Sequence, residues 1–247
     1  MLKLIKRLDF AFIDCDESVL FRGGDRESRL PIGCFAWLLL DDTSGKYTLI
    51  DTGVTDIDAV NGTKRGVSVW HRSKNGKSLV EHLTAMGIDA KNVQTVVISH
   101  AHYDHLSGIP CLPFSKIYMT QAAYKSAIDP QNPNAKYLEE AARFLQEQND
   151  KGMVIFTSDN QEIMPGLSVL HAAAHTAGDQ LIQLQNDSAR YLFTGDALFL
   201  LENIRRNLPI GFGNDPQEGD RVLALCKKFK GKIMTGHDLG CVVEEET

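Results

Sequence analysis

The sequence predicts a mixed α/β fold with β-sheets in the interior and helices on the outside. Segments of strand length and composition outnumber helical segments and are interleaved with them along the chain. One of these segments, 93–99, is a largely apolar run, which is typical of a strand buried on both faces of a sheet. No Gly/Ser-rich, Pro-rich or single-charge run interrupts the sequence, so we expect a single domain over residues 1–247.

Strands are predicted from short apolar runs, and helices from apolar residues that share one face. Strands at 34–40 and 47–50 form a hairpin around the polar segment D-D-T-S-G-K. Further strands are predicted at 93–99, 116–119, 153–156, 167–171, 181–184, 191–194 and 232–235, and helices at 78–86, 135–148 and 216–229. In the helix at 135–148, Tyr137, Ala141, Phe144 and Leu145 share a face, which favours docking on the core over covering the site.

Charge and cysteine content restrict the classes of partner. The chain has 26 Lys and Arg against 32 Asp and Glu, a formal net charge of −6, so nucleic acid would bind against an unfavourable field. We therefore expect a small-molecule substrate and no nucleic acid. The five cysteines are odd in number, scattered and without a C-x-x-C pair, which argues against a disulfide framework and a thiolate zinc site.

The N-terminal segment does not have the pattern of a signal peptide. Asp9 and Asp14 interrupt its apolar stretch. No segment approaches the roughly 20 apolar residues that a membrane helix needs. Together with the scattered cysteines, these features predict a cytoplasmic protein without a membrane partner.

A cluster of ligand-type residues follows the apolar run at 93–99. The segment His100-Ala101-His102-Tyr103-Asp104-His105 contains three imidazoles and a carboxylate within six residues. A single histidine there would suggest only a surface residue, but interleaved imidazole and carboxylate are the ligands that borderline divalent metals favour. Four such side chains here, and further ones later in the sequence, indicate either more potential ligands than one ion needs or two ions.

Three further residues of the same kind each follow a predicted strand. They are His175 in A-A-A-H-T-A-G-D, Asp196 in F-T-G-D and His237 in T-G-H-D. Taken singly, each is as well explained by a turn or a hydrogen-bonded cap. As an ordered set with the histidine cluster, the seven residues predict a metal centre.

The order H-x-H-x-D-H, a distant His, Gly-Asp and Gly-His resembles the metallo-β-lactamase superfamily, and Asp51-Thr52-Gly53 fits the same pattern. The resemblance implies a four-layer αββα sandwich of two mixed β-sheets flanked by helices, with two metals where the sheets meet. It also implies that His100, His102 and His175 hold the first metal, Asp104, His105 and His237 the second, and that Asp196 bridges them. Asp51 would orient the histidine loop.

Two bound metals imply hydrolysis. A water shared by the metals loses a proton near neutral pH, and the resulting hydroxide attacks an electrophilic carbon or phosphorus. Asp104 and Asp196 are therefore expected catalytic residues as well as ligands, and Asp104 is also a candidate proton relay to the leaving group. The ligand set favours zinc, although iron, manganese and cobalt accept the same donors.

Within the superfamily, the chain is similar to the acyl-homoserine lactonases and to 4-pyridoxolactonase. Its length, the segment L-P-I-G-C-F-A-W-L-L-L and the ending T-G-H-D are similar to theirs. Nuclease members usually carry a basic exosite or an extra domain, and diiron members have Glu in place of His102, so both fit poorly. The resemblance implies hydrolysis of a lactone with an apolar substituent. Related lactonases are often dimers, which leaves a homodimer open.

Two positions depart from the lactonase pattern. Phe199 stands where the lactonases have a tyrosine that donates a hydrogen bond to substrate, and Asp179 replaces the last histidine of H-T-P-G-H. Tyr103 is an expected catalytic residue that could replace the missing hydroxyl, with packing as the alternative. An apolar pocket could be lined by Trp70, Phe199, Leu200, Leu201 and Phe212, although such residues are more often core.

Several assignments stay open. The same centre could hydrolyse a linear ester, thioester, phosphotriester or amide, and the fold could serve a ligand-binding regulator without catalysis. No role is predicted for His71, His82 and His171, and Asp238 is expected to be a local hydrogen-bond partner.

Overall fold

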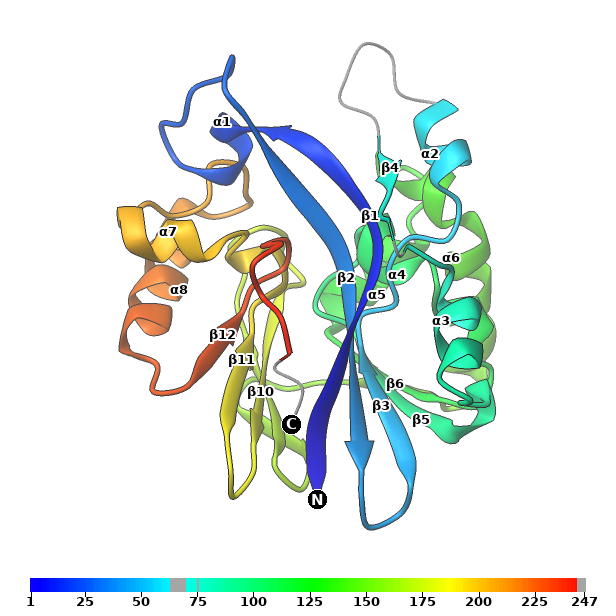
Figure 1. Cartoon of the computed structure of the whole chain (residues 1–247). Coiled ribbons are helices and arrows are strands. Elements are labelled where there is room, and N and C mark those ends of the chain that lie inside the picture. The colour runs from blue at the N-terminus through cyan, green and yellow to red at the C-terminus, as the bar shows by residue number, and fades with distance from the viewer. Residues whose placement is uncertain (63–69, 75, 244–247) are drawn as a thin grey trace.

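Two β-sheets pack face to face with helices on both outer sides (Figure 1). This computed structural model describes residues 1–62, 70–74 and 76–243. Within these residues, the first sheet has the strand order β4-β1-β2-β3-β5-β6-β7 and the second β12-β11-β10-β9-β8. Helices α3, α5 and α6 lie outside the first sheet, and α7 and α8 lie outside the second. The predicted four-layer sandwich of two mixed sheets is confirmed.

The first sheet contains β1 (Leu2–Asp16), β2 (Arg29–Asp41), β3 (Lys46–Ile50), β4 (His71–Arg72), β5 (Val93–Val97), β6 (Lys116–Met119) and β7 (Val154–Phe156). The second contains β8 (Gln161–Met164), β9 (Leu167–His171), β10 (Gln180–Gln185), β11 (Arg190–Phe193) and β12 (Lys232–Met234). The helices are α1 (Glu17–Leu20), α2 (Ile57–Gly62), α3 (Leu79–Ala85), α4 (Tyr103–Leu106), α5 (Gln121–Ile128), α6 (Ala135–Asp150), α7 (Leu201–Arg206) and α8 (Pro216–Lys228). All strands and helices predicted from the sequence are present, with shifts of one or two residues at their ends, except that β2 begins five residues before the predicted strand at 34–40.

Strands β1, β4 and β8 and helices α1, α2, α4, α5 and α7 were not among the predicted elements. Charged residues are interleaved with the apolar residues of β1, which therefore lacks an uninterrupted apolar run. Its stability comes from antiparallel pairing with β2 along nearly its whole length, from Leu2 opposite Asp41 to Asp16 opposite Arg29. Such long-range pairing is not visible in a local pattern.

The core between the sheets is built by alternation along β2. Phe35, Trp37 and Leu39 point toward the second sheet and pack in one cluster with residues of β9, β10 and β11. The intervening Cys34, Ala36 and Leu38 belong to the other core cluster, which includes the apolar residues of the outer helices. Because successive strand side chains point to opposite faces, β2 contributes to both cores.

Helix α6 docks on the core, as its amphipathic sequence predicts. Leu138, Ala141 and Leu145 are buried, and Tyr137 and Phe144 are partly buried against the same core cluster. Among the described residues, no helix has the length and apolar character needed to cross a membrane.

The ends of four strands converge at one edge of the two sheets. Strand β5 leads to His100, β9 to His175, β11 to Asp196 and β12 to His237. Parallel pairing of β11 with β12 places the last two of these residues on neighbouring strand ends.

Candidate metal centre

The seven residues predicted as ligands come together in two groups at this edge. The first contains His100, His102, His175 and Asp196, and the second contains Asp104, His105 and His237. In each group, one potential ligand atom from every residue lies within 4.8 Å of the others. The sequence therefore identified every member of both groups.

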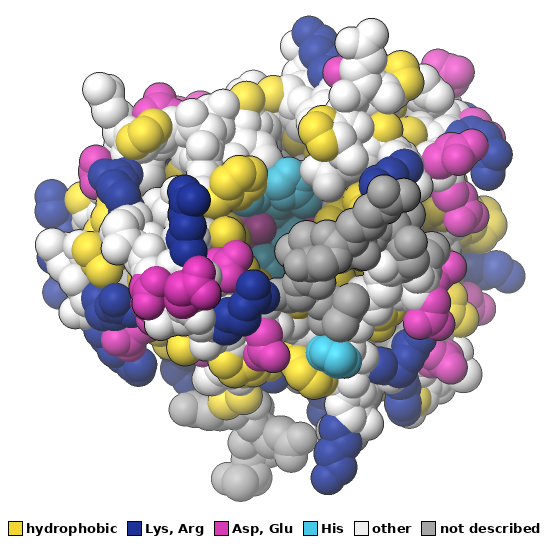
Figure 2. All heavy atoms as spheres, turned by 90° about the horizontal axis from the view of Figure 1, so that it is seen from above, with side chains coloured by type: hydrophobic (Ala, Val, Ile, Leu, Met, Phe, Trp, Pro, Cys, Tyr) yellow, Lys and Arg dark blue, Asp and Glu magenta, His cyan; other side chains and the backbone are white. Residues whose placement is uncertain are grey.

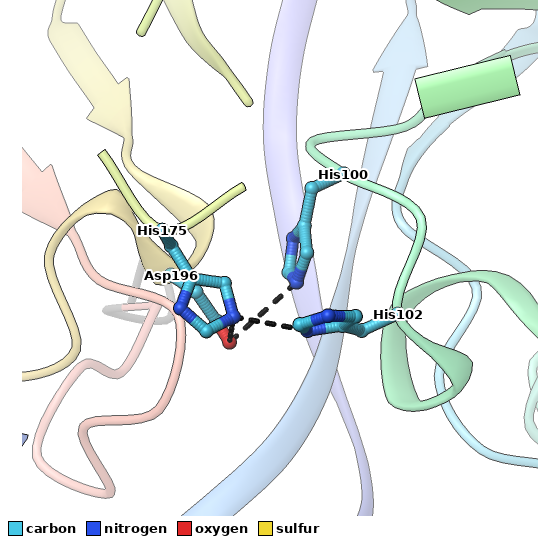
Figure 3. Close-up of side chains that lie close together, drawn as sticks. All are labelled: His100, His102, His175 and Asp196. Carbon is cyan, nitrogen blue, oxygen red and sulfur yellow. Dashed lines mark hydrogen bonds and ion pairs between the residues drawn. The ribbon is translucent and has the colours of Figure 1, made fainter. Parts of the chain in front are cut away.

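The first group is shown in Figure 3, where its side chains converge from both halves of the molecule. Oδ2 of Asp196 lies 3.4 Å from Nε2 of His175 and 3.6 Å from Nε2 of His100. Nδ1 of His102 lies 2.9 Å from Nε2 of His175. His102 thus presents Nδ1 to this cluster, whereas His100 and His175 present Nε2.

Asp196 lies between the two groups. While Oδ2 faces the first group, Oδ1 lies 2.9 Å from Nε2 of His237 and 3.1 Å from Nε2 of His105. Oδ2 of Asp104 lies 3.9 Å and 3.8 Å from the same two nitrogens. The two oxygens of one carboxylate therefore face different groups, an arrangement that suits a bridge between two ions.

Two glycines permit this close approach. A Cβ on Gly195, whose φ is +48°, would lie 2.7 Å from the side chain of Ser99. A Cβ on Gly236 would lie 2.6 Å from the carbonyl oxygen of Gly195 and 2.7 Å from Oδ1 of Asp196. Side chains at these positions would force the strand ends apart.

Contacts on Nδ1 orient three of the imidazoles. Nδ1 of His237 lies 2.5 Å from the carbonyl oxygen of Gly33, and Nδ1 of His175 lies 3.2 Å from that of Phe212. Nδ1 of His105 lies 2.8 Å from Oδ2 of Asp51. Because these oxygens are acceptors, they favour the proton on Nδ1 and leave the Nε2 lone pair directed into the centre.

Asp51 supports both groups through Ser99. The Ser99 amide donates to Oδ1 of Asp51 at 2.7 Å, and the Ser99 hydroxyl donates to Oδ2 at 2.8 Å. The Ser99 oxygen is then available to accept from Nδ1 of His100, 3.2 Å away. The orienting contacts expected of Asp51 are therefore present, and they extend to His100 as well as His105.

The buried polar atoms of the centre fit bound metal ions. Among the described residues, Nε2 of His100, Nε2 of His105 and Oδ1 of Asp196 are buried without a hydrogen bond. The short approaches of His105 and His237 to Oδ1 of Asp196 therefore lack hydrogen-bond geometry. Two ligands about 2.1 Å from one tetrahedral ion lie about 3.4 Å apart, close to the spacing around Oδ2 of Asp196. The donor set and its geometry support divalent-metal binding.

The pKa values of the imidazoles are shifted in opposite directions. Burial, with repulsion from His105, holds the pKa of His100 well below its usual range, and burial with His175 lowers the pKa of His102 to about 4. Burial also opposes protonation of His105 and His237, but attraction to Asp196 outweighs it and raises the pKa of each. Burial alone would raise the pKa of Asp196, but attraction to His237 and His105 outweighs this effect. The pKa of Asp196 is therefore lowered, and the side chain stays a carboxylate.

Asp179 stabilises the turn that carries His175. Its carboxylate accepts from the amides of His175 at 2.6 Å and Thr176 at 2.9 Å, and from the Thr176 hydroxyl at 2.5 Å. At the position where the lactonase pattern has a histidine, this chain therefore has a carboxylate that accepts hydrogen bonds from backbone amides.

The aromatic residues near the centre differ in exposure. Phe199 is buried and packs on two of the predicted ligands, with ring centroids 5.3 Å from His175 and 5.7 Å from His237. Trp70 is also buried and donates from Nε1 to the Tyr103 hydroxyl at 2.7 Å. Phe212 is exposed beside His175. Of the suggested apolar pocket residues, only Phe212 is largely exposed; Leu200 is buried and Leu201 partly buried.

Other polar residues have local partners. Asp238 accepts from the amides of Leu201 and Gly240, as expected. Ser99 and the carbonyl groups of Gly33 and Phe212 were not predicted to take part. A serine next to a histidine cluster offers a weak signal in retrospect, but a backbone carbonyl offers none.

Figure 2 shows histidine side chains at the bottom of a hollow in the face seen from above. Hydrophobic side chains lie around part of the rim, and charged side chains lie farther out. The centre is thus reached from one face of the molecule.

Comparison with known proteins agrees with this architecture. The family model described as the metallo-beta-lactamase superfamily matches residues 29–233. An N-acyl homoserine lactonase of Bacillus sp. is 27% identical over 230 residues, which cover 88% of this chain and 86% of the relative.

Two solved structures have the same fold. A mutant of Bacillus thuringiensis AiiA with N-decanoyl-L-homoserine at its active site gives a TM-score of 0.79 at 20% identity and covers 97% of this chain and 94% of its own. AidC, a dizinc quorum-quenching lactonase, gives 0.68 at 15% identity, with 97% and 91% covered. From the match over residues 29–233 and the sandwich that carries the two ligand groups, we conclude that the chain belongs to the metallo-β-lactamase superfamily.

Proposed function

We propose that the protein is a metal-dependent hydrolase that opens a lactone ring, with an N-acyl homoserine lactone as the substrate class. The observation that carries the proposal is the position of Asp196, whose two oxygens face separate groups of ligand-type residues. The N-acyl homoserine lactonase relative supports the substrate class. We also propose that the enzyme consists of a single domain and is located in the cytoplasm.

In this proposal each group holds one divalent ion. His100, His102 and His175 serve the first and Asp104, His105 and His237 the second, with Asp196 shared. Zinc is the proposed metal because imidazole and carboxylate ligands suit it, and the structural neighbour AidC is described as dizinc. Iron, manganese and cobalt accept the same donors.

Such ions, when bound, would activate water as a nucleophile at neutral pH and polarise the carbonyl group whose carbon is attacked. The protein residues supply orientation and proton transfer. Asp51 and the carbonyl groups of Gly33 and Phe212 hold the imidazoles in place. Asp104 is the proposed relay that passes a proton to the alcohol oxygen leaving on ring opening.

Tyr103 is the proposed source of the hydroxyl that Phe199 lacks. Trp70 donates to the Tyr103 oxygen, which restricts the orientation of the phenol. Burial raises the pKa of Tyr103, so the phenol keeps its proton and can act as a donor. In this role it would hydrogen-bond to the substrate carbonyl or to the leaving oxygen.

A panel of substrates tests the proposal. Initial rates would be measured for zinc- and manganese-loaded protein on acyl-homoserine and aliphatic lactones, linear esters, thioesters, a phosphotriester and a β-lactam, with Asp196→Ala as the blank. Lactone turnover well above the rest is the expected result. Turnover of another class alone would retain the hydrolase and reject the lactone, an outcome that the missing hydroxyl at Phe199 would explain. Binding without turnover of any substrate would indicate a regulator.

A further inference from the structure

Phe212 is an exposed aromatic side chain beside a ligand of the proposed first metal. It exposes 58% of its surface, and its ring centroid lies 5.6 Å from that of His175 at an interplanar angle of 66°. Phe199 contacts the same imidazole but is only 3% exposed. Phe199 is therefore part of the packed core, whereas the ring of Phe212 is largely exposed beside His175.

The backbone around Phe212 is held from both sides. The amides of Gly211 and Phe212 donate to the carbonyl oxygen of Val19 at 3.0 and 2.9 Å. The amide of Asn214 donates to the carbonyl oxygen of Ala174 at 2.7 Å. The carbonyl of Phe212 itself accepts from His175 at 3.2 Å. The segment is thus fixed between α1 and the loop that carries His175.

The two glycines that flank Phe212 reinforce this placement. A Cβ on Gly211 would overlap the carbonyl oxygen of Ser18, and a Cβ on Gly213 would overlap that of Ala174. The backbone therefore passes closer to its neighbours than another residue would allow. An aromatic ring on so constrained a backbone loses little conformational freedom when a ligand packs against it.

We propose that Phe212 is a specificity-determining residue: its ring contacts the aliphatic acyl chain of the substrate while its carbonyl orients His175. The inference rests on the proposed function for the substrate class. It explains why a large apolar side chain is exposed at this position and why the chain is held so closely there. Contact over roughly 55 Å² of apolar surface, at ~25 cal/mol per Å², corresponds to about a tenfold preference for a long chain.

Binding of the ring-opened products tests the inference without requiring turnover. Calorimetry would give the affinities of zinc-loaded protein for N-butanoyl- and N-decanoyl-homoserine. Phe212→Ala should reduce the preference for the decanoyl compound about tenfold, and Phe212→Leu should reduce it less. Metal content should not change, because the carbonyl that orients His175 belongs to the backbone.

Phe114→Ala is the matched control. Phe114 is also 58% exposed, but it precedes β6, at the end of that strand opposite the metal centre. Its removal should leave the affinity ratio unchanged. A wild-type protein without chain-length preference, or equal losses for both compounds in Phe212→Ala, would overturn the inference.

Turnover, measured separately, distinguishes this failure from failure of the proposed function. If lactones are not hydrolysed but the chain-length preference depends on Phe212, the lactonase proposal fails and the inference holds. If lactones are hydrolysed and Phe212→Ala leaves the affinity ratio unchanged, only the inference fails.

Discussion

Nδ1 of His105 lies 2.8 Å from Oδ2 of Asp51, although 54 residues separate the two in the chain. The same carboxylate accepts two hydrogen bonds from Ser99, whose hydroxyl oxygen lies 3.2 Å from His100. One buried side chain thus orients an imidazole in each proposed metal site. Its backbone has φ +60°, a conformation that Asp and Asn tolerate better than most residues.

Asp51→Asn should weaken metal binding about 10- to 100-fold, because the substitution removes the negative charge and replaces one of the two carboxylate acceptors of His105 and Ser99 with an NH2 donor. Asn also tolerates the backbone conformation, so the fold should be retained. Competition with a chelator would measure the affinity. The same substitution at Asp159, which accepts from the amide of His171, is the control. Unchanged affinity in Asp51→Asn would show that the contact does not orient the ligands.

Asp196→Ala should lose metal from both sites, because the two oxygens of Asp196 face different groups. Mass spectrometry of the metal content would measure this loss. Metal at a thousand times its Kd should raise the wild-type Tm by about 10 °C, and the variant should show little shift. Asp187→Ala, on an exposed turn, is the control. Full metal content in Asp196→Ala would reject the bridging role.

Phe199→Tyr should raise kcat for a lactone about two- to tenfold, the effect of one added hydrogen bond to substrate. The ring already packs against His175 and His237, so the substitution adds a hydroxyl at the centre itself. Steady-state kinetics and metal content would be compared with Phe156→Tyr, a change on β7. An unchanged kcat would mean that the missing hydroxyl does not limit the reaction.

Tyr103→Phe should lower kcat about tenfold or more if the phenol donates to the substrate. Metal content should stay the same because Tyr103 is not a proposed ligand. Tyr137→Phe removes a hydroxyl from the neighbouring ring, 5.0 Å away between centroids, and serves as the control. Equal effects of the two variants on kcat would assign Tyr103 to packing.

Asp179 should make stability depend on pH. Burial raises its pKa to about 6, against the opposing effects of His175 and Thr176, whereas an unfolded Asp titrates near 3.9. The folded protein therefore binds more protons between these values, and the stability contributed by the protonated carboxyl is lost as pH rises through about 6.

Relative to Asp179→Asn, metal-depleted wild-type protein should lose about 1–3 kcal/mol of unfolding free energy between pH 4 and about 6.5. Urea unfolding at several pH values would measure this difference. Asp159→Asn should follow the wild-type protein throughout. A wild-type advantage that grows with pH would contradict the raised pKa.

The sequence by itself predicted which ligand-type residues come together in the two groups and which strands lead to them. The histidine cluster follows the apolar strand β5, and Asp196 and His237 follow β11 and β12. These signals are local: apolar runs identify buried strands, and ligand-type residues at their ends identify the chemistry. The sheet arrangement was predicted only from the resemblance to the superfamily. Strand β1 was not predicted, because it is stabilised by long-range pairing with β2.

Only the tertiary structure decided how the ligands are oriented. The packing of two sheets places the oxygens of Asp196 toward different groups and places the carbonyl of Gly33 on His237, 204 residues away. It also buries Phe199 while leaving the ring of Phe212 exposed. These relations depend on backbone groups and on contacts between distant segments, and neither leaves a pattern in the order of the side chains.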